Sequence, residues 1–284
     1  MEVHTNPVGK VILAAAGPGD PELVTLKTVK YLQQADVILT DRLVSDEIIR
    51  QWANPGAIVT YVGKQCRRGN STPQETINEL LIEHAYNGKL VVRLKGGDSS
   101  IFSNILDELE TVQKYNIPFE IVPGVTAALG AAAYAGMPLT ARGYSTAVRF
   151  LTYYKSDVLT DDYWRELANT TDTLVFYMSS ETLDTVIDKL IFNQISNECH
   201  VAVIEQATTP HQNIYTSNIY TFNSKFKNER FVSPSIVVIG KVVSLTGKFN
   251  WVGNSNSKES YFKTVAPLST NSTNLNKKSN VNRA

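Results

Sequence analysis

The chain has 284 residues, enough for two α/β domains, and with 43% hydrophobic residues it can bury a sizeable core. Lysine plus arginine and aspartate plus glutamate number 27 each, and this zero net charge gives no sign of general nucleic-acid binding. Cys66 and Cys199 form neither a disulfide framework nor a metal-ligand spacing. The opening stretch MEVHTNPVGK has no apolar signal segment, and no apolar run approaches the roughly 20 residues of a membrane span. We therefore expect a cytoplasmic protein without a metal, a nucleic-acid partner or a membrane partner.

Short apolar runs alternate with longer amphipathic runs in the first half of the sequence. Strands are predicted at residues 10–17, 36–40, 57–61, 89–94 and 119–122, and helices at residues 23–34, 72–88, 103–115 and 126–136. This alternation predicts a mostly parallel sheet that helices cover on both faces. Because ligands of such sheets bind beyond the carboxyl ends of the strands, we expect the site in the loops that follow them.

Two of the predicted helices carry more detailed signals. In the helix at residues 23–34, apolar side chains recur on one face, which predicts that this face is buried; they are Leu23, Leu26, Val29 and Leu32. In the helix at residues 72–88, Thr72 is the expected N-cap, because a proline follows it and a glutamate stands three positions after it.

The first domain is expected at residues 8–142 and a second α/β domain at residues 143–252. The second domain has β-like runs at residues 146–154, 173–178, 200–206, 212–222 and 234–243 and a helix at residues 183–191, from which we expect a mixed sheet. Beyond residue 252 the sequence is rich in asparagine and serine and poor in apolar residues. Residues 253–284 are therefore expected to form a disordered tail.

The loop after the first predicted strand, GPGDPE at residues 17–22, has two of the three glycines of a dinucleotide-binding fingerprint. Asp20 and Glu22 place negative charge where a pyrophosphate would need a helix N-terminus without competing anions. Pro18 and Pro21 remove backbone donors from the same place. The charges and the missing donors argue against an NAD site, which is the alternative that the glycine spacing raises.

The stretch KGGDSS follows the predicted strand at residues 89–94. Gly96 and Gly97 allow a sharp exit from the strand and a close approach of a ligand to the backbone. The carboxylate of Asp98 suits hydroxyl groups or a cation better than it suits a phosphate. A glycine turn in which Asp98 caps the next helix explains the same residues, so both interpretations stay open.

Several segments of the chain occur together, in the same order, in one known family. They are AAGPGDPELVTLKTVKYLQQADVILTDRLVSDEI, YVGK, VVRLKGGD, VPGVTAALGAAAYAGMPLT, TLVFYM and PSIVVIGKVV. Over about residues 9–252 the chain resembles the tetrapyrrole methylase family. The resemblance implies two α/β domains with the active-site cleft between them, a homodimer, and S-adenosylmethionine as the cofactor.

Carried over position by position, the resemblance implies a set of cofactor contacts. These are Pro18, Gly96, Gly97, Asp98, Ile101, Thr126, Ala127, Met178 and Ala207. S-adenosylmethionine has ribose hydroxyls, an ammonium and a sulfonium but no phosphate, so an acidic strand end flanked by glycines suits it.

The resemblance also implies the reaction. Methyl groups would pass to two pyrrole carbons of uroporphyrinogen III to give precorrin-2, a precursor of sirohaem and cobalamin. In this resemblance Asp41 is the proton acceptor and Lys64 a proton donor. The residues alone equally allow Asp41 to be an N-cap or a partner of Arg42, and Lys64 to be an ordinary solvated lysine.

A tetrapyrrole that carries many carboxylates implies arginines in the cleft, because arginine pairs with a carboxylate through two parallel hydrogen bonds. The candidates are Arg42, Arg67, Arg68, Arg93, Arg142 and Arg149, of which Arg67 and Arg68 are alternatively solvated loop residues. The chain departs from the family pattern mostly on the substrate side, at Ser99, Asn104, Ala141 and Tyr153–Tyr154. A sister methylase of a later precorrin and a non-catalytic paralogue that binds the cofactor or a tetrapyrrole therefore stay open as alternatives.

Overall fold

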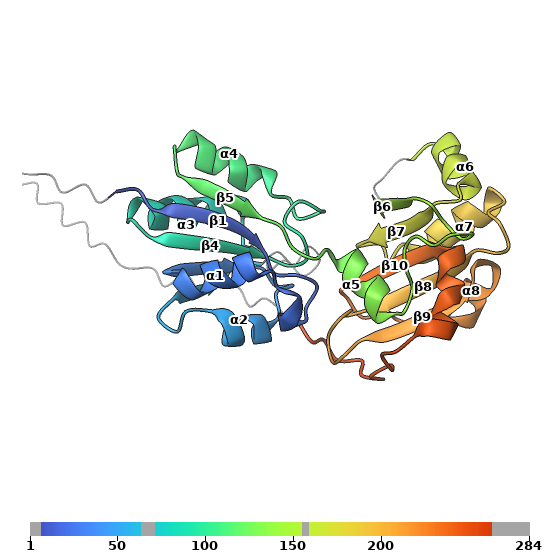
Figure 1. Ribbon diagram of the computed structural model, residues 1–284. Helices are drawn as coiled ribbons and strands as arrows, with labels where there is room; N and C mark the ends of the chain where they lie inside the picture. Colours follow the sequence, from blue (N-terminus) through green and yellow to red (C-terminus); the bar gives the residue numbers. More distant parts are fainter. Residues whose placement is uncertain (1–6, 64–71, 155–158, 263–284) are drawn as a thin grey trace, which may run out of the picture.

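The computed structural model describes residues 7–63, 72–154 and 159–262, and its elements are arranged around two sheets (Figure 1). The first sheet has five parallel strands in the order β3-β2-β4-β1-β5. They are β1 (Lys10–Ala15), β2 (Val37–Thr40), β3 (Ile58–Tyr61), β4 (Leu90–Lys95) and β5 (Phe119–Val122). The predicted parallel sheet is confirmed, and its strand-end loops lie at one edge. Within these three ranges, no helix is long and apolar enough to cross a membrane.

Helices cover both faces of the first sheet, as the sequence predicts (Figure 1). On one face lie α1 (Leu26–Gln34) and α2 (Asp46–Trp52), and on the other α3 (Gln74–Tyr86) and α4 (Leu106–Lys114). Each face has its own apolar cluster, one around Leu32 and Ile38 and the other around Leu81 and Val112. Helix α2 is not predicted from the sequence, because seven residues show too little periodicity.

The predicted apolar face of the first helix is wrong at one position. Leu26 is 88% exposed, whereas Thr28 and Leu32 are buried. A separate 3-10 turn, η1 (Pro21–Leu23), precedes the helix, and the Thr25 hydroxyl then caps α1 by accepting the N–H of Thr28 at 3.3 Å. Because the helix starts anew after this break, the periodicity counted from residue 23 does not continue through it.

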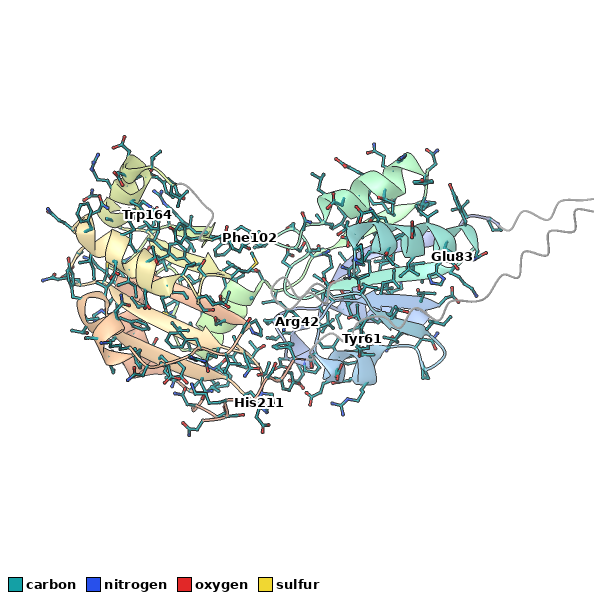
Figure 2. All side chains as sticks on the ribbon, turned by 180° about the vertical axis from the view of Figure 1, so that it is seen from behind. Arg42, Tyr61, Glu83, Phe102, Trp164 and His211 are labelled. Atoms are coloured by element: carbon teal, nitrogen blue, oxygen red, sulfur yellow. The ribbon has the colours of Figure 1, made fainter. Side chains whose placement is uncertain are left out.

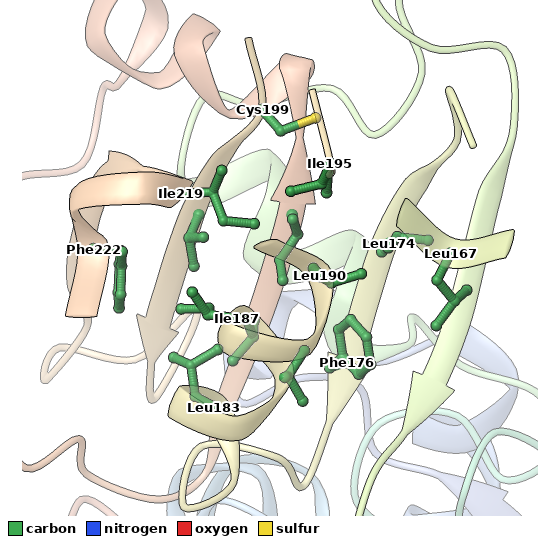
Figure 3. Close-up of a cluster of buried hydrophobic side chains, with 14 of the residues drawn as sticks. Leu167, Leu174, Phe176, Leu183, Ile187, Leu190, Ile195, Cys199, Ile219 and Phe222 are labelled. Atoms are coloured by element: carbon green, nitrogen blue, oxygen red, sulfur yellow. The ribbon is translucent and has the colours of Figure 1, made fainter. Parts of the chain in front are cut away.

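The second sheet is mixed, as expected, and has the order β6-β7-β10-β8-β9. Its strands are β6 (Val148–Thr152), β7 (Thr173–Tyr177), β8 (His200–Glu205), β9 (Asn213–Asn218) and β10 (Ser235–Gly240). β6 runs parallel to β7, whereas β10 is antiparallel to both β7 and β8, and β8 is antiparallel to β9. The other elements are α6 (Asp161–Asn169), α7 (Leu183–Phe192), α8 (Ile219–Lys225), η2 (Lys241–Leu245) and α9 (Thr246–Phe249). Leu183, Ile187 and Leu190 of α7 lie in one buried cluster with Leu174 and Phe176 of β7 (Figure 3).

Two other predicted boundaries differ from the structure. Pro73 rather than Thr72 occupies the N-cap position of α3, and no side chain caps this helix. The β-like run at residues 212–222 ends early, because the side chain of Asn218 accepts the N–H of Tyr220 and starts α8.

Helix α5 (Ala127–Tyr134) lies between the two sheets in Figure 1. Ala128 and Ala131 share one buried cluster with Val175 and Val238 of the second sheet. The division expected at residue 142 places this helix in the first domain, whereas its apolar contacts are with the second sheet. Small side chains allow this close approach, and a run of alanines does not indicate from its pattern which sheet the helix will cover.

Residues 254–262, here called the C-terminal strap, pack against the protein and do not form the disordered tail expected from residue 253. Asn254 pairs with the backbone of Ile214, and the side-chain amide of Gln206 bonds the backbone of both Glu259 and Tyr261. Phe262 at the end of the strap is 4% exposed. Polar side chains elsewhere in the fold supply these partners, so the low apolar content of the segment gave no signal of its order.

Candidate functional site

The loops after β1 and β4 are joined at their glycines. Gly17 and Gly97 exchange two backbone hydrogen bonds, of 3.0 and 2.7 Å. Gly97 has φ +69, in the left-handed region that glycine adopts at little cost. The loop after β5 is equally close, since a Cβ on Gly124 would lie 2.6 Å from the Cβ of Ala15. Three strand-end loops of the first sheet therefore meet in one place.

Asp98 fixes the conformation of these loops. Asp98 is 8% exposed, and its carboxylate accepts the N–H groups of Ser100 at 2.8 Å and Gly124 at 2.9 Å. Burial alone would raise the pKa of this carboxyl, but the hydrogen bonds from Ser100 and Gly124 outweigh it and lower the pKa. Asp98 does not cap a helix, because α4 begins only at Leu106. The site thus contains an ionised carboxylate that its own loops hold.

In the loop of residues 17–22, the N–H groups of Gly17, Asp20 and Glu22 all have acceptors within the protein. The side chain of Asp20 accepts the N–H of Glu22 at 2.8 Å and so occupies the N-terminus of η1 itself. The hydroxyl of Tyr134 donates to Asp20 at 2.5 Å, and burial together with Asp20 raises the pKa of Tyr134 to about 12. The structure agrees with the sequence argument against a dinucleotide at this loop.

Tyr177 at the end of β7 joins the second sheet to the start of α5. Its hydroxyl lies 2.7 Å from the Thr126 hydroxyl and accepts the N–H of Ala128 at 3.1 Å. Its ring lies 4.9 Å from the ring of Phe102, which comes from the loop after β4; Figure 2 shows Phe102 where the two halves meet. Met178 follows directly, with φ +55 and 47% of its surface exposed. Met178 thus belongs to the same group of loops.

The loop after β8 completes this group. The backbone N–H of Asp20 donates to the Thr208 hydroxyl at 3.2 Å, and a Cβ on Gly19 would lie 3.4 Å from the carbonyl oxygen of Ala207. Helix α5 also packs against the loop after β1, since a Cβ added to Gly130 would lie only 2.6 Å from the Cγ of Pro18. The positions expected to contact the cofactor all lie on these connected loops or next to them: Pro18, Gly96, Gly97, Asp98, Ile101, Thr126, Ala127, Met178 and Ala207.

Asp41 follows β2 and has an arginine partner that the sequence does not indicate. Arg93 donates from Nη2 to Asp41 at 2.5 Å and from Nε to Glu108 at 2.8 Å. Arg93 is 2% exposed, so its expected role of binding substrate carboxylates is wrong: both carboxylates that it can reach belong to the protein. Burial would lower the pKa of the guanidinium, but Asp41 and Glu108 outweigh it and raise the pKa.

Arg149 is a second correction among the expected substrate arginines. It lies at the amino end of β6, away from the strand end that adjoins Met178, and pairs with Asp172 at 2.6 Å and Glu166 at 2.5 Å. Arg142 is exposed in the turn that follows Ala141. Arg42 lies where the two halves meet in Figure 2. Lys64, Arg67 and Arg68 lie outside the described residues.

Several residues of this site gave no clear signal in the sequence. Tyr177 could have been found from its place directly before Met178, and Tyr134 lies within the family segment VPGVTAALGAAAYAGMPLT but was not singled out there. Thr208 lies outside the family segments. Conversely, Tyr153 is a core residue whose ring packs 5.2 Å from that of Trp164. Among the described residues, no group of three His, Cys, Asp or Glu side chains could hold a metal ion.

The fold is that of an α/β protein with two sheets, and the loops at the ends of their strands form one connected candidate site. The sequence profile described as Tetrapyrrole (Corrin/Porphyrin) Methylases matches residues 10–223. The chain belongs to this family, and the expectation drawn from its motifs is confirmed.

Siroheme synthases are among the similar proteins. That of Stutzerimonas stutzeri is 43% identical over 249 residues, which cover 88% of this chain and 53% of that protein. That of Vesicomyosocius okutanii is 41% identical over 244 residues, which cover 86% of this chain and 52% of that protein. The chain thus spans about half the length of these relatives.

Solved structures show the same fold. A uroporphyrin-III C-methyltransferase from Thermus thermophilus has a TM-score of 0.71 and 31% identity, and covers 86% of this chain and 98% of its own. A Thermus thermophilus structure of this enzyme complexed with S-adenosylhomocysteine has a TM-score of 0.69 and 32% identity, with coverages of 84% and 100%. A cobalt precorrin-4 methyltransferase has a TM-score of 0.73 and 28% identity, with coverages of 82% and 95%.

Proposed function

We propose that this chain is a methyltransferase that uses S-adenosylmethionine to convert uroporphyrinogen III to precorrin-2. The observation that carries the proposal is the single group of loops from both sheets, which holds an ionised Asp98 and has the N-terminus of η1 occupied by Asp20. The similarity to a uroporphyrin-III C-methyltransferase and to siroheme synthases supports this substrate.

The residues present fit the cofactor chemically. When bound, S-adenosylmethionine supplies a methyl group on a positively charged sulfur, together with ribose hydroxyls and an ammonium group. The carboxylate of Asp98 and the glycine backbone at residues 96–97 offer negative charge and acceptor oxygens to such groups. The remaining expected contacts, among them Pro18, Thr126 and Ala207, belong to loops that touch one another.

Asp41 is the residue that we assign to proton removal from the methylated macrocycle, because it follows a strand of the first sheet and its side chain is 26% exposed. Lys64 is assigned as a proton donor by the family motif alone. For the substrate carboxylates, Arg42 and Arg142 remain candidates, together with Arg67 and Arg68. The chain's own part in the reaction is to orient the macrocycle and to hold and accept protons.

We also propose that the protein is a cytoplasmic homodimer. An apolar groove of about 660 Å³ lies beside α5, and Leu129 on α5 and Phe249 in α9 both line it and are more than half exposed. Such a face suits a partner surface of the same kind. The chain's two cysteines suit a reducing compartment. Light scattering on the purified chain should give twice the monomer mass. The Leu129→Asp variant should give the monomer mass.

Incubation with S-adenosylmethionine and uroporphyrinogen III tests the proposed reaction. The product should gain the mass of two methyl groups, and an unchanged mass would reject this substrate. The likeness to a cobalt precorrin-4 methyltransferase favours a sister methylase as the second candidate, which would methylate a later precorrin instead. Calorimetric titration with S-adenosylhomocysteine run beside the assay would reveal a paralogue that binds the cofactor without turnover.

A further inference from the structure

Four charged side chains from three elements meet below the strand-end loops of the first sheet. Arg93 and Lys95 stand on β4, Glu108 on α4, and Asp41 directly after β2. Glu108 accepts from the Nε of Arg93 at 2.8 Å and from the Nζ of Lys95 at 2.8 and 3.1 Å. The side chains of Arg93, Lys95 and Glu108 are at most 3% exposed, whereas that of Asp41 is 26% exposed. The cluster is buried at one end and reaches the surface only at Asp41.

The guanidinium of Arg93 is held from several directions. Besides Asp41 and Glu108, its Nη1 donates to the backbone carbonyls of Leu39 at 3.2 Å and Leu94 at 3.4 Å. These carbonyls belong to β2 and β4, whose ends carry the loops of the site. A planar guanidinium with such partners has one orientation, and so the Nη2 that faces Asp41 is fixed as well.

The charges in the cluster balance pairwise. Lys95 binds both oxygens of Glu108, which leaves Asp41 as the second carboxylate needed to balance Arg93. Buried ion pairs are weak contributors to stability, because desolvation offsets much of their attraction. A buried cluster that ends in one partly exposed carboxylate at the candidate site is therefore better explained as a means of positioning that carboxylate.

We propose that Arg93 is a positioning residue that holds the carboxylate of Asp41 for proton removal, with Glu108 as its anchor. The proposal rests on the proposed function in taking Asp41 as the proton acceptor. In that step a proton leaves the methylated macrocycle for a carboxylate oxygen of Asp41, and the electron pair of the broken bond stays with the macrocycle. The charged groups that face Asp41 are Arg93 and Lys95, with Arg42 next to it in the chain.

The test uses Arg93→Lys, Arg93→Met and Asp41→Asn in the full chain. Displacement of a catalytic group by about 1 Å costs about 100-fold in rate, so Arg93→Met should lower kcat by about this factor. Arg93→Lys keeps a cation and should restore at least a tenth of the wild-type kcat. The KM for S-adenosylmethionine and the Kd for S-adenosylhomocysteine should change less than threefold. A loss of cofactor affinity equal to the loss of kcat would overturn the positioning role.

A double-mutant cycle separates action through Asp41 from a general structural effect. If Arg93 acts through Asp41, Arg93→Lys should cost nothing further once Asp41→Asn is present. If the losses of kcat caused by Arg93→Lys and Asp41→Asn multiplied in the double variant, the proposal would be overturned. Normal turnover in Asp41→Asn would also overturn it, but the proposed methylation itself would then stand. Glu108→Gln, which removes the anchor of Arg93, should lower kcat as Arg93→Lys does. Its matched control is Glu120→Gln, which removes ion pairs on β5, at the far side of the sheet from β2, and should leave kcat unchanged.

A crystal structure of Arg93→Met gives a readout that does not need turnover. The Asp41 carboxylate should move from its position in the wild-type protein or take more than one conformation. An unmoved, singly ordered carboxylate would overturn the proposal even if uroporphyrinogen III proved not to be the substrate.

Discussion

The hydroxyl oxygens of Tyr261 and Ser45 are 3.1 Å apart, although the two residues are 216 positions apart in the sequence. Ser45 is the N-cap of α2, and it ends the loop that begins at Asp41. Tyr261 belongs to the C-terminal strap, in which the N–H of Tyr261 and the carbonyl of Glu259 bond the side chain of Gln206, the residue before Ala207. The strap therefore connects a loop of the second sheet to the loop that carries the assigned proton acceptor.

Removal of residues 254–284 should destabilise the protein and weaken cofactor binding. Burial of a phenylalanine such as Phe262 contributes about 2 kcal/mol, and the strap's hydrogen bonds add to this. Thermal unfolding should shift down by several degrees, and the Kd for S-adenosylhomocysteine should rise. Removal of residues 263–284 alone is the control and should change neither value. Equal behaviour of the two truncations would show that the strap has no such role.

Tyr177→Phe should weaken cofactor binding with a modest loss of stability. The change removes the hydrogen bond to Thr126 and leaves the N–H of Ala128 without its acceptor, at a cost of about 1–3 kcal/mol. Urea unfolding and calorimetric titration with S-adenosylhomocysteine would measure the two effects. Tyr220→Phe is the matched control, because its hydroxyl bonds the carbonyl of Ile195 away from the site and its loss should leave the Kd unchanged.

Gly97→Val should reduce affinity for S-adenosylhomocysteine at least tenfold. A branched side chain at φ +69 costs about 1–2 kcal/mol in backbone strain. The backbone would move to relieve this strain, and the two hydrogen bonds between Gly97 and Gly17 would shift with it. Calorimetry would give the Kd. Gly143→Val imposes similar strain at φ +82, in a turn with nothing within 4 Å of the added Cβ. If both variants lost affinity equally, the effect would not come from the loop after β4.

Glu120→Gln should destabilise the protein near neutral pH but not in acid. Hydrogen bonds from Lys10, Lys27 and Tyr31 lower the pKa of Glu120 from 4.5 to about 2. A lowered carboxyl pKa stabilises the folded state above the unfolded value, so this stabilisation is lost as the pH falls from 4.5 towards 2. Urea unfolding should show wild type and variant separated at pH 7, with the difference shrinking below pH 4.5 and the two converging only as the pH approaches 2. A constant difference would contradict the prediction, and high salt should shrink the difference at pH 7.

Local patterns in the sequence were sufficient to predict the strands of the first sheet, their parallel arrangement and the two glycine loops. Apolar runs of strand length are visible without knowledge of their neighbours, and the acidic residues at 20, 22 and 98 argue against a phosphate ligand from residue type alone. The short helix α2 was missed because seven residues show too little periodicity, and the displaced face of α1 was missed because a 3-10 turn and a capping threonine precede that helix.

The partners of the charged residues lay beyond the reach of any local pattern. The sequence around an arginine near the end of a strand is the same whether its guanidinium faces a ligand or, as in Arg93, two carboxylates of its own protein. In the same way, the packing of α5 on the second sheet and the order of the strap depend on side chains far away in the sequence. Residue type and spacing established the strands, the loop charges and the family, since these are properties of short segments. Burial and pairing between distant segments arise only on folding, and they assign Arg93 to Asp41 rather than to a substrate.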